Sequence, residues 1–260
     1  MALTNVPRSR WNNYRAYQEQ SKNNMAPGHV FPILYCTKHG ERSLSMMKWG
    51  IVPHFLPRGA KHDHFKMFNA RIETVESKAS FRNIIKDQRC VVMINGFFEW
   101  KVGALGKKQP YYICRGDGLP LKLACIYEVR QEESESPLIT FSIITCSTAA
   151  SSLKEVHDRQ PFFLTDQEVE QWIDNSGPPP TWLLSRHQQS NHWLSNSPPT
   201  NSSQSLPLEE QHPSSVTFDD ALLVYYPVTT KMTAMSYQED DVHKPLRHHL
   251  GITSFFHRKM

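Results

Sequence analysis

Hydrophobic and polar positions alternate along several short segments of the chain, which is the pattern of half-buried β-strands. β-branched and aromatic residues are common in these segments, and Gly, Pro and polar residues separate them. The predicted extended segments are 30–37, 43–55, 67–75, 89–101, 111–116, 121–129, 138–146 and 221–229. Many short strands joined by turns predict an α+β fold, with a mainly antiparallel, barrel-like sheet as its core and a few peripheral helices.

Helical spacing of apolar residues appears in only a few places. Segment 76–88 carries Phe81, Ile84 and Ile85 at helical spacing, which predicts a short helix. Segment 147–156 is expected to form a short linking helix. Segment 165–174 opens with Thr165 followed three residues later by a glutamate, a capping box that marks the start of a helix.

The chain is expected to form one domain over residues 1–260, with two atypical segments. Residues 185–215 are rich in Ser, Asn, Gln and Pro, so they bury too little apolar area to offset the entropy of ordering and are predicted to be a disordered insert. Residues 244–260 form a basic tail. Its adjacent His248 and His249 lack the convergent spacing of a zinc site, so no metal is predicted.

The composition narrows the class of protein. Hydrophobic residues make up 39% of the 260 positions, which is enough for a packed core, and the net charge of +4 permits a polyanionic partner. No apolar run approaches the ~20 residues of a membrane span, and the N-terminus lacks the apolar region of a secretory signal. The odd number of cysteines, five, and the absence of a CxxC motif predict reduced thiols of an intracellular protein.

The stretch CVVMINGFFEW places Glu99 between Phe98 and Trp100 at the end of an apolar run. A carboxyl group held against aromatic rings loses water, and this favours its neutral, proton-donating form. The alternative is a glutamate that points to solvent at the end of a strand. This residue type in this setting therefore predicts a candidate general acid/base.

Two further polar motifs are candidates for a site. The motif FNAR places Asn69 and Arg71 on the same side of an extended chain, where an amide and a guanidinium can orient a polar group and bind a phosphate. The motif VHDRQ supplies His157, which can exchange a proton near neutral pH, together with Asp158 and Arg159. Each motif alone also fits a solvated turn.

Aromatic and thiol groups add weaker signals. Trp49 and Phe55 lie near basic residues, as in sites that stack single-stranded bases, although aromatic residues at such positions are also common in cores. Cys146 precedes His157 by eleven residues, but nothing around it resembles the turn that presents a nucleophile.

Taken in order, six motifs carry a resemblance to a known family. They are NNMAPG, WGIVP, FNARIET, GFFEW, KKQPYYI and VHDRQP, and they extend over residues 24–165, with YYPVT near residue 225 less clearly. Together they resemble the SRAP family, the SOS-response-associated peptidases. The resemblance implies a DNA-damage-response protein that binds abasic sites in single-stranded DNA.

The resemblance also implies roles for residues at the matching positions. Those implied to be catalytic are Asn69, Glu99 and His157. Those implied to contact DNA are Arg71, Arg159, Asn24, Pro27, Trp100 and Phe55. No cofactor and no metal is implied, the partner is single-stranded DNA containing abasic sites, and the protein is expected to be a monomer located in the nucleus of a eukaryote or the cytoplasm of a bacterium.

The family chemistry begins at an N-terminal Met-Cys-Gly-Arg, whose cysteine amine and thiol together capture the lesion's aldehyde in a covalent protein–DNA crosslink. This chain begins Met1-Ala2-Leu3-Thr4, and we expect that it is truncated relative to the family pattern. The family is described in terms of peptidase, hydrolase and lyase chemistry. Without the cysteine, whether this chain is itself an enzyme stays open.

Two other functions fit the same residues. A non-catalytic module for single-stranded nucleic acid would use the arginines and aromatics, with Glu99 and His157 in structural roles. An intracellular hydrolase of unrelated substrates would use Glu99 and His157, but the chain lacks a recognisable nucleophile motif.

Overall fold

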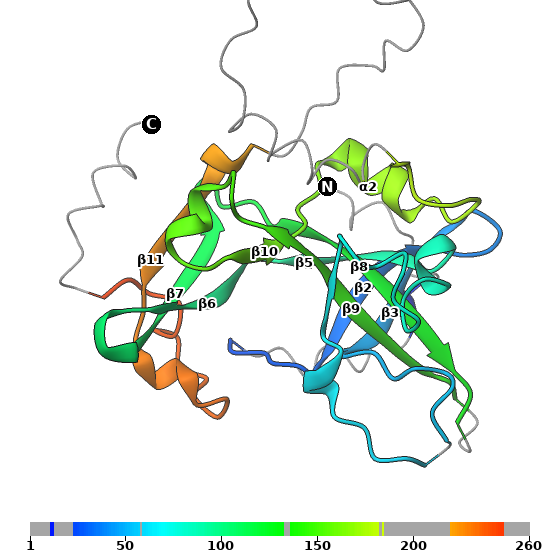
Figure 1. Cartoon of the computed structure of the whole chain (residues 1–260), viewed down its shortest axis with the longest axis horizontal. Helices are drawn as coiled ribbons and strands as arrows, with labels where there is room; N and C mark the ends of the chain where they lie inside the picture. The colour runs from blue at the N-terminus through cyan, green and yellow to red at the C-terminus, as the bar shows by residue number, and fades with distance from the viewer. Residues whose placement is uncertain are drawn as a thin grey trace, which may run out of the picture.

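A computed structural model describes residues 11–12, 23–57, 59–132, 136–181, 184 and 219–246, and it confirms the predicted α+β fold dominated by antiparallel strands (Figure 1). The strands are β1 Trp11–Asn12, β2 Val30–Cys36, β3 Arg42–Trp49, β4 Asn69–Arg71, β5 Arg89–Ile94, β6 Gly96–Val102, β7 Lys108–Arg115, β8 Leu121–Arg130, β9 Leu138–Ser147, β10 Arg159–Pro161 and β11 Leu223–Pro227.

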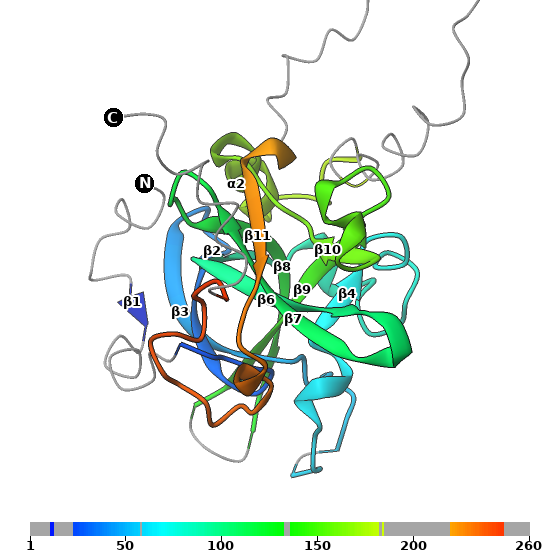
Figure 2. The same cartoon turned by 90° about the vertical axis from the view of Figure 1, so that its left-hand side faces the viewer.

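Five of these strands close into a barrel. Strands β3, β2, β5, β8 and β9 are antiparallel neighbours in that order, and β9 returns to β3 in a parallel pairing that joins Lys48 to Thr140 and Trp49 to Phe141. Closure leaves few unpaired strand edges. Strands β6, β7 and β11 form a separate sheet, which lies to the left of the barrel in Figure 1 and faces the viewer in Figure 2.

The predicted strand 89–101 divides between the two sheets. Strand β5 ends at Ile94 in the barrel, and β6 starts at Gly96 in the small sheet. A Cβ atom at Gly96 would lie 2.4 Å from the ring of Tyr112, so only glycine allows β6 and β7 to approach this closely. The hydrophobic pattern did not reveal this break, because apolar residues continue on both sides of it.

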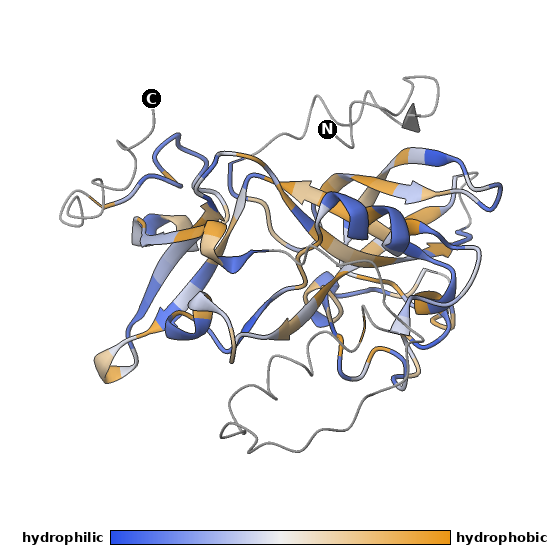
Figure 3. Ribbon diagram, turned by 90° about the horizontal axis from the view of Figure 1, so that it is seen from above, coloured by the Kyte–Doolittle hydropathy of each residue, from blue (hydrophilic) through white to orange (hydrophobic). Residues whose placement is uncertain are grey.

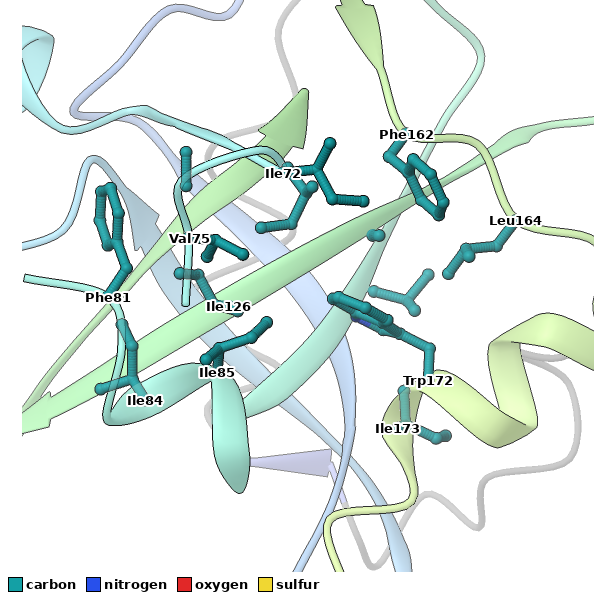
Figure 4. Close-up of a cluster of buried hydrophobic side chains, with 14 of the residues drawn as sticks. Ile72, Val75, Phe81, Ile84, Ile85, Ile126, Phe162, Leu164, Trp172 and Ile173 are labelled. Carbon is teal, nitrogen blue, oxygen red and sulfur yellow. The ribbon is translucent and has the colours of Figure 1, made fainter. Parts of the chain in front are cut away.

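The barrel sheet has an apolar cluster on each face. One face packs against α2, Asp166–Ile173, whose fully buried Trp172 donates its indole N–H to the carbonyls of Cys90 and Cys125 at 3.0 and 3.1 Å (Figure 4). The other face carries residues such as Phe141 and packs against the small sheet through Ile113. The functional motifs lie on this second face.

Only one of the predicted helices forms as an α-helix. Helix α2 has the predicted capping box, with Thr165 and Glu168 bonded reciprocally. Segment 76–88 instead consists of turns and one 3-10 turn, although its apolar residues are buried as expected. The buried guanidinium of Arg89 donates to the carbonyls of Ile85 and Lys86, the last carbonyls of this segment, as the chain enters β5.

The predicted linking helix also shortens to a 3-10 turn, η6. The 3-10 helices are η3 His64–Lys66, η4 Ile84–Lys86, η5 Ala104–Gly106, η6 Ser152–Glu155, η7 Asp220–Leu222 and η8 Thr230–Thr233. The insert predicted at 185–215 and the tail beyond residue 246 lie outside the described residues.

Hydropathy follows this architecture. Apolar residues run along the strands, while the outward side of α2 and many loops are hydrophilic (Figure 3). Over the part of the chain that the structure describes, no helix is both long and apolar enough to cross a membrane.

Candidate functional site

Two of the predicted motifs meet at the end of strand β9. Thr145 on β9 pairs with Arg71 of β4 on one side and with Pro161 of β10 on the other. Because side chains alternate along a strand, these registers place Asn69, Arg71 and Arg159 on the same face of the sheet. This face is the one that turns toward the small sheet.

The motif FNAR has the predicted geometry. Asn69 and Arg71 are exposed, and Ala70 between them is fully buried in the cluster on the opposite face. The burial of Ala70 fixes the strand, so the amide and the guanidinium project together. The shared side of these two groups is confirmed.

Glu99 lies on the face of β6 that turns toward the barrel. Its neighbours on that face are Phe97, which packs in the barrel-side cluster, and Tyr111, which pairs directly with Glu99 across the sheet. Burial raises the pKa of the Glu99 carboxyl, while His157 and the backbone N–H of Trp100 lower it in part. The carboxyl therefore holds its proton to a higher pH than an exposed glutamate.

The sequence suggested a different reason for this desolvation. Phe98 and Trp100 flank Glu99 along the chain, but they point to the opposite face of the small sheet. There they pack with Val228 and Met232 of the segment that follows β11. The idea that these two rings enclose Glu99 is therefore wrong, and burial against the barrel replaces it.

His157 is fixed through one ring nitrogen. Its Nδ1 accepts the backbone N–H of Arg159 at 3.0 Å, and Asp158 Oδ1 lies 3.1 Å from the same atom. The hydroxyl of Thr148 donates to the His157 carbonyl at 2.7 Å. The Arg159 carbonyl also lies 3.2 Å from Nδ1, so this nitrogen has one donor and two acceptors beside it, and either tautomer of the ring finds a partner there.

Glu99 lies in the small sheet and His157 in the loop before β10, and the two groups still influence each other. The charge of His157 lowers the pKa of Glu99, and Asp158 next to it raises that pKa. Such an effect requires the groups to lie near one another. A carboxyl that retains its proton beside an imidazole is suited to moving protons to and from a bound molecule.

Arg159 is held by its neighbours in this structure. Its Nη1 and Nη2 donate to the two carboxylate oxygens of Glu73 at 2.7 and 3.0 Å, and Nη2 also donates to the Thr145 carbonyl at 2.7 Å. This two-pronged pairing fixes the plane of the guanidinium. Arg71, in contrast, is exposed.

Asn24 and Pro27 lie in the segment before β2. Asn24 is buried, and its side-chain amide donates to the carbonyl of Met232 at 2.8 Å, while Gln238 bonds both main-chain groups of Asn24. Pro27 is half-buried in the turn that leads to Gly28. Asn24 thus joins the start of the barrel to the segment after β11.

Trp100 and Phe55 lie apart from Glu99. Trp100 is on the opposite face of β6, where its indole N–H is 3.5 Å from the Thr233 hydroxyl. Phe55 is 59% exposed in the turn after β3, with its ring edge against His54. Among the described residues, no hydrogen bond, ion pair or ring contact joins either side chain to Glu99 or His157.

In the described part of the chain, neither the cysteines nor the residue types that can bind a metal form a second candidate site. Cys146 belongs to the cluster with Ala70 and Ile144, on the face opposite Thr145, so it does not face His157 in the way a nucleophile would need. None of the five cysteines, all of which lie in the described part of the chain, forms a disulfide. Among the described residues, no group of His, Cys, Asp and Glu has the arrangement of a metal site.

Glu73 and Gln238 make contacts that the sequence analysis missed. Glu73 follows Arg71 by two positions, so the alternation that joined Asn69 to Arg71 could have included it. Gln238 lies 214 residues from Asn24, and no local pattern connects the two.

The fold and site together define a β-barrel protein with a carboxyl–imidazole pair and an adjacent strand that carries an amide and a guanidinium. Residues 4–193 match the family described as SOS response associated peptidase (SRAP), so the chain belongs to that family, as its motifs predicted.

Relatives in bacteria and animals support this assignment. The chain is 32% identical over 144 residues to the abasic site processing protein YoqW of Bacillus subtilis, covering 55% of this chain and 62% of that protein. It is 31% identical to YedK of Escherichia coli (58% and 63%) and 33% identical to HMCES of Gallus gallus (58% and 53%), both also named abasic site processing proteins. The chain thus matches less than two thirds of each relative's length.

A solved structure shares the fold. A protein from Bacteroides thetaiotaomicron superposes with a TM-score of 0.61 over 84% of this chain and 82% of its own, at 22% identity. This likeness concerns the fold alone.

Proposed function

We propose that this protein acts in the DNA-damage response by binding abasic sites in single-stranded DNA. The family membership and the names of the relatives support this proposal. The observation that carries it is the Glu99 carboxyl, whose pKa is raised by burial and which lies within electrostatic range of His157. An abasic site opens to an aldehyde, and addition to an aldehyde needs groups that deliver and remove protons.

In this proposal each group has a distinct part. Glu99 moves the protons needed when an amine adds to the aldehyde and water leaves, and His157 exchanges a proton with the sugar oxygen. Asn69 orients the opened sugar, and the exposed Arg71 binds a flanking phosphate. The covalent crosslink that the resemblance implies forms when an N-terminal cysteine supplies an amine and a thiol to the same aldehyde.

The experiment compares three single-stranded oligonucleotides of one sequence: undamaged, uracil-excised, and carrying a tetrahydrofuran that lacks the aldehyde. Binding is measured by fluorescence anisotropy, and crosslinking on denaturing gels, for this chain and for one extended by Met-Cys-Gly-Arg. We expect preferential binding to the uracil-excised strand, and a gel shift with the extended chain alone. A folded protein that binds all three strands equally and gives no shift contradicts the proposal.

A non-catalytic single-stranded nucleic-acid module is the competing function. The exposed Phe55 and Arg71 are what such a module would use. Salt-dependent binding that does not distinguish the three strands and is unchanged by Glu99→Gln would favour it.

A further inference from the structure

The ion pair between Glu73 and Arg159 spans the end of strand β9. Glu73 follows strand β4, and Arg159 begins β10, and these two strands pair with opposite edges of β9. The carboxylate and the guanidinium meet in two hydrogen bonds of 2.7 and 3.0 Å. The pair therefore ties the strand of Asn69 and Arg71 to the segment that carries His157.

The Arg159 side chain is fixed at more than one atom. Besides Glu73, its Nη2 donates to the carbonyl and the hydroxyl of Thr145 at 2.7 and 3.1 Å. The same carbonyl accepts the backbone N–H of Ile72 at 3.0 Å. A guanidinium whose Nη1 and Nη2 both donate to fixed oxygens has one orientation, and the main chain that carries it has little freedom.

That main chain sets the state of His157. The backbone N–H and the carbonyl of Arg159 lie 3.0 and 3.2 Å from His157 Nδ1, so both main-chain groups of Arg159 hold this ring nitrogen. Any shift of β10 moves these two groups and releases the ring. The line of contacts thus runs from the Glu73 carboxylate through Arg159 to the imidazole.

We propose that Glu73 is a positioning residue of this site, which acts through Arg159 to hold the orientation and the tautomer of His157. Its effect on lesion chemistry rests on the proposed function, but its effect on the His157 ring does not. The position also carries a charge: Glu73 neutralises Arg159, so its removal frees a cation beside the strand that carries Arg71.

The tautomer is measured directly by NMR. Protein labelled with 15N-histidine gives two-bond correlations that distinguish a proton on Nε2 from one on Nδ1, and His157→Gln identifies the signal among the 13 histidines. At a pH where the ring is neutral, we expect the pattern of one dominant tautomer in the native protein, because the Arg159 main chain holds Nδ1 in one environment. Glu73→Gln should convert it to exchange between both tautomers, and Glu73→Asp should restore part of the native signal.

The matched control is Glu76→Gln, which removes an exposed carboxylate from the same turn region and should leave the His157 signal unchanged. Arg159→Lys keeps the positive charge but loses the two-pronged contact with Glu73, so it should change the His157 signal in the same way as Glu73→Gln. It replaces Glu73→Gln in this test if Glu73→Gln folds poorly. A native His157 pattern in both folded variants overturns the proposal.

The DNA experiment separates positioning from general damage to the fold. In Glu73→Gln we expect reaction of the extended chain with the uracil-excised strand to fall about 10-fold. Binding to the undamaged strand should stay the same or tighten, because one negative charge is gone. Equal losses in both measurements overturn the proposal. If the native protein shows no lesion preference, the proposed function fails and the NMR result alone decides the role of Glu73.

Discussion

The two faces of the sheet β6–β7–β11 use neighbouring residues for opposite purposes. On one face, Glu99 and its cross-strand partner Tyr111 turn toward the barrel and His157. On the other, Trp100 and Tyr112 pack beneath the segment that follows β11. One peptide bond separates the group proposed for chemistry from a group that serves packing. The comparison teaches that adjacency in the motif GFFEW does not mean a shared site, because strand alternation separates the side chains.

The largest effect is expected on the barrel-facing side. Glu99→Gln keeps the shape and removes the exchangeable proton, so the reaction of the extended chain with the uracil-excised strand should fall about 100-fold or more. Single-turnover rates on denaturing gels measure this, with Glu76→Gln as control. A loss of less than about threefold would show that Glu99 is not the acid/base group.

The opposite face should respond in stability rather than in chemistry. Trp100→Ala removes a half-buried ring from the cluster with Val228 and Met232, and should lower the free energy of unfolding by about 2 kcal/mol. Single-turnover rates of the folded variant should stay within about twofold of the native rate. Urea denaturation gives the first quantity. A large loss of the single-turnover rate in a variant with native stability would show that Trp100 belongs to the site. The two faces of the small sheet would then not differ in their roles.

The attachment of the covering segment gives a smaller effect. Asn24→Ala removes the hydrogen bond from its side chain to the buried carbonyl of Met232 and should lower the free energy of unfolding by about 1–2 kcal/mol. Amide hydrogen exchange should then speed up at residues 228–246. The exposed Asn23, which bonds the Gln238 carbonyl, is the matched control, and Asn23→Ala should have the weaker effect. Equal exchange rates in both variants would mean that Asn24 does not hold this segment.

The smallest effect is a pH dependence of stability. Because the folded pKa of Glu99 lies above its unfolded value, its contribution to stability is fully present below about pH 4.5 and is lost as pH rises through the folded pKa. Glu99→Gln should therefore become more stable relative to the native protein as pH rises through that range. Urea denaturation across pH measures the difference, and a constant difference would contradict the burial of this carboxyl.

Much of the fold could be predicted because apolar and polar residues alternate along a strand that has one buried face. The same rule correctly placed Asn69 and Arg71 on one side of β4. It failed at 89–101, since a run that is apolar throughout does not show that Gly96 moves the chain into a second sheet. It also failed at 76–88, where Phe81, Ile84 and Ile85 are buried as helical spacing predicts but the backbone forms turns and one 3-10 turn.

The motifs predict which residues belong to the candidate site, but they do not predict how these residues are held in place. Motif order indicated Glu99, His157 and the arginines, but the Glu73–Arg159 pair joins residues 86 positions apart. Asn24 shows the same limit, because its partner Gln238 lies almost at the other end of the described chain. Such contacts depend on which distant segments lie side by side in the folded chain, and no local pattern contains this information.

The most direct test of the central claim, that Glu99 of the small sheet and His157 of the loop before β10 form one pair, is the pKa of the Glu99 carboxyl measured by 13C NMR. In the native protein it should lie above the usual 4.5, and His157→Gln should raise it further because a nearby positive charge is lost. His54→Gln, a change at an exposed ring, should leave it unchanged. An ordinary pKa for Glu99 that does not respond to His157→Gln would contradict the account.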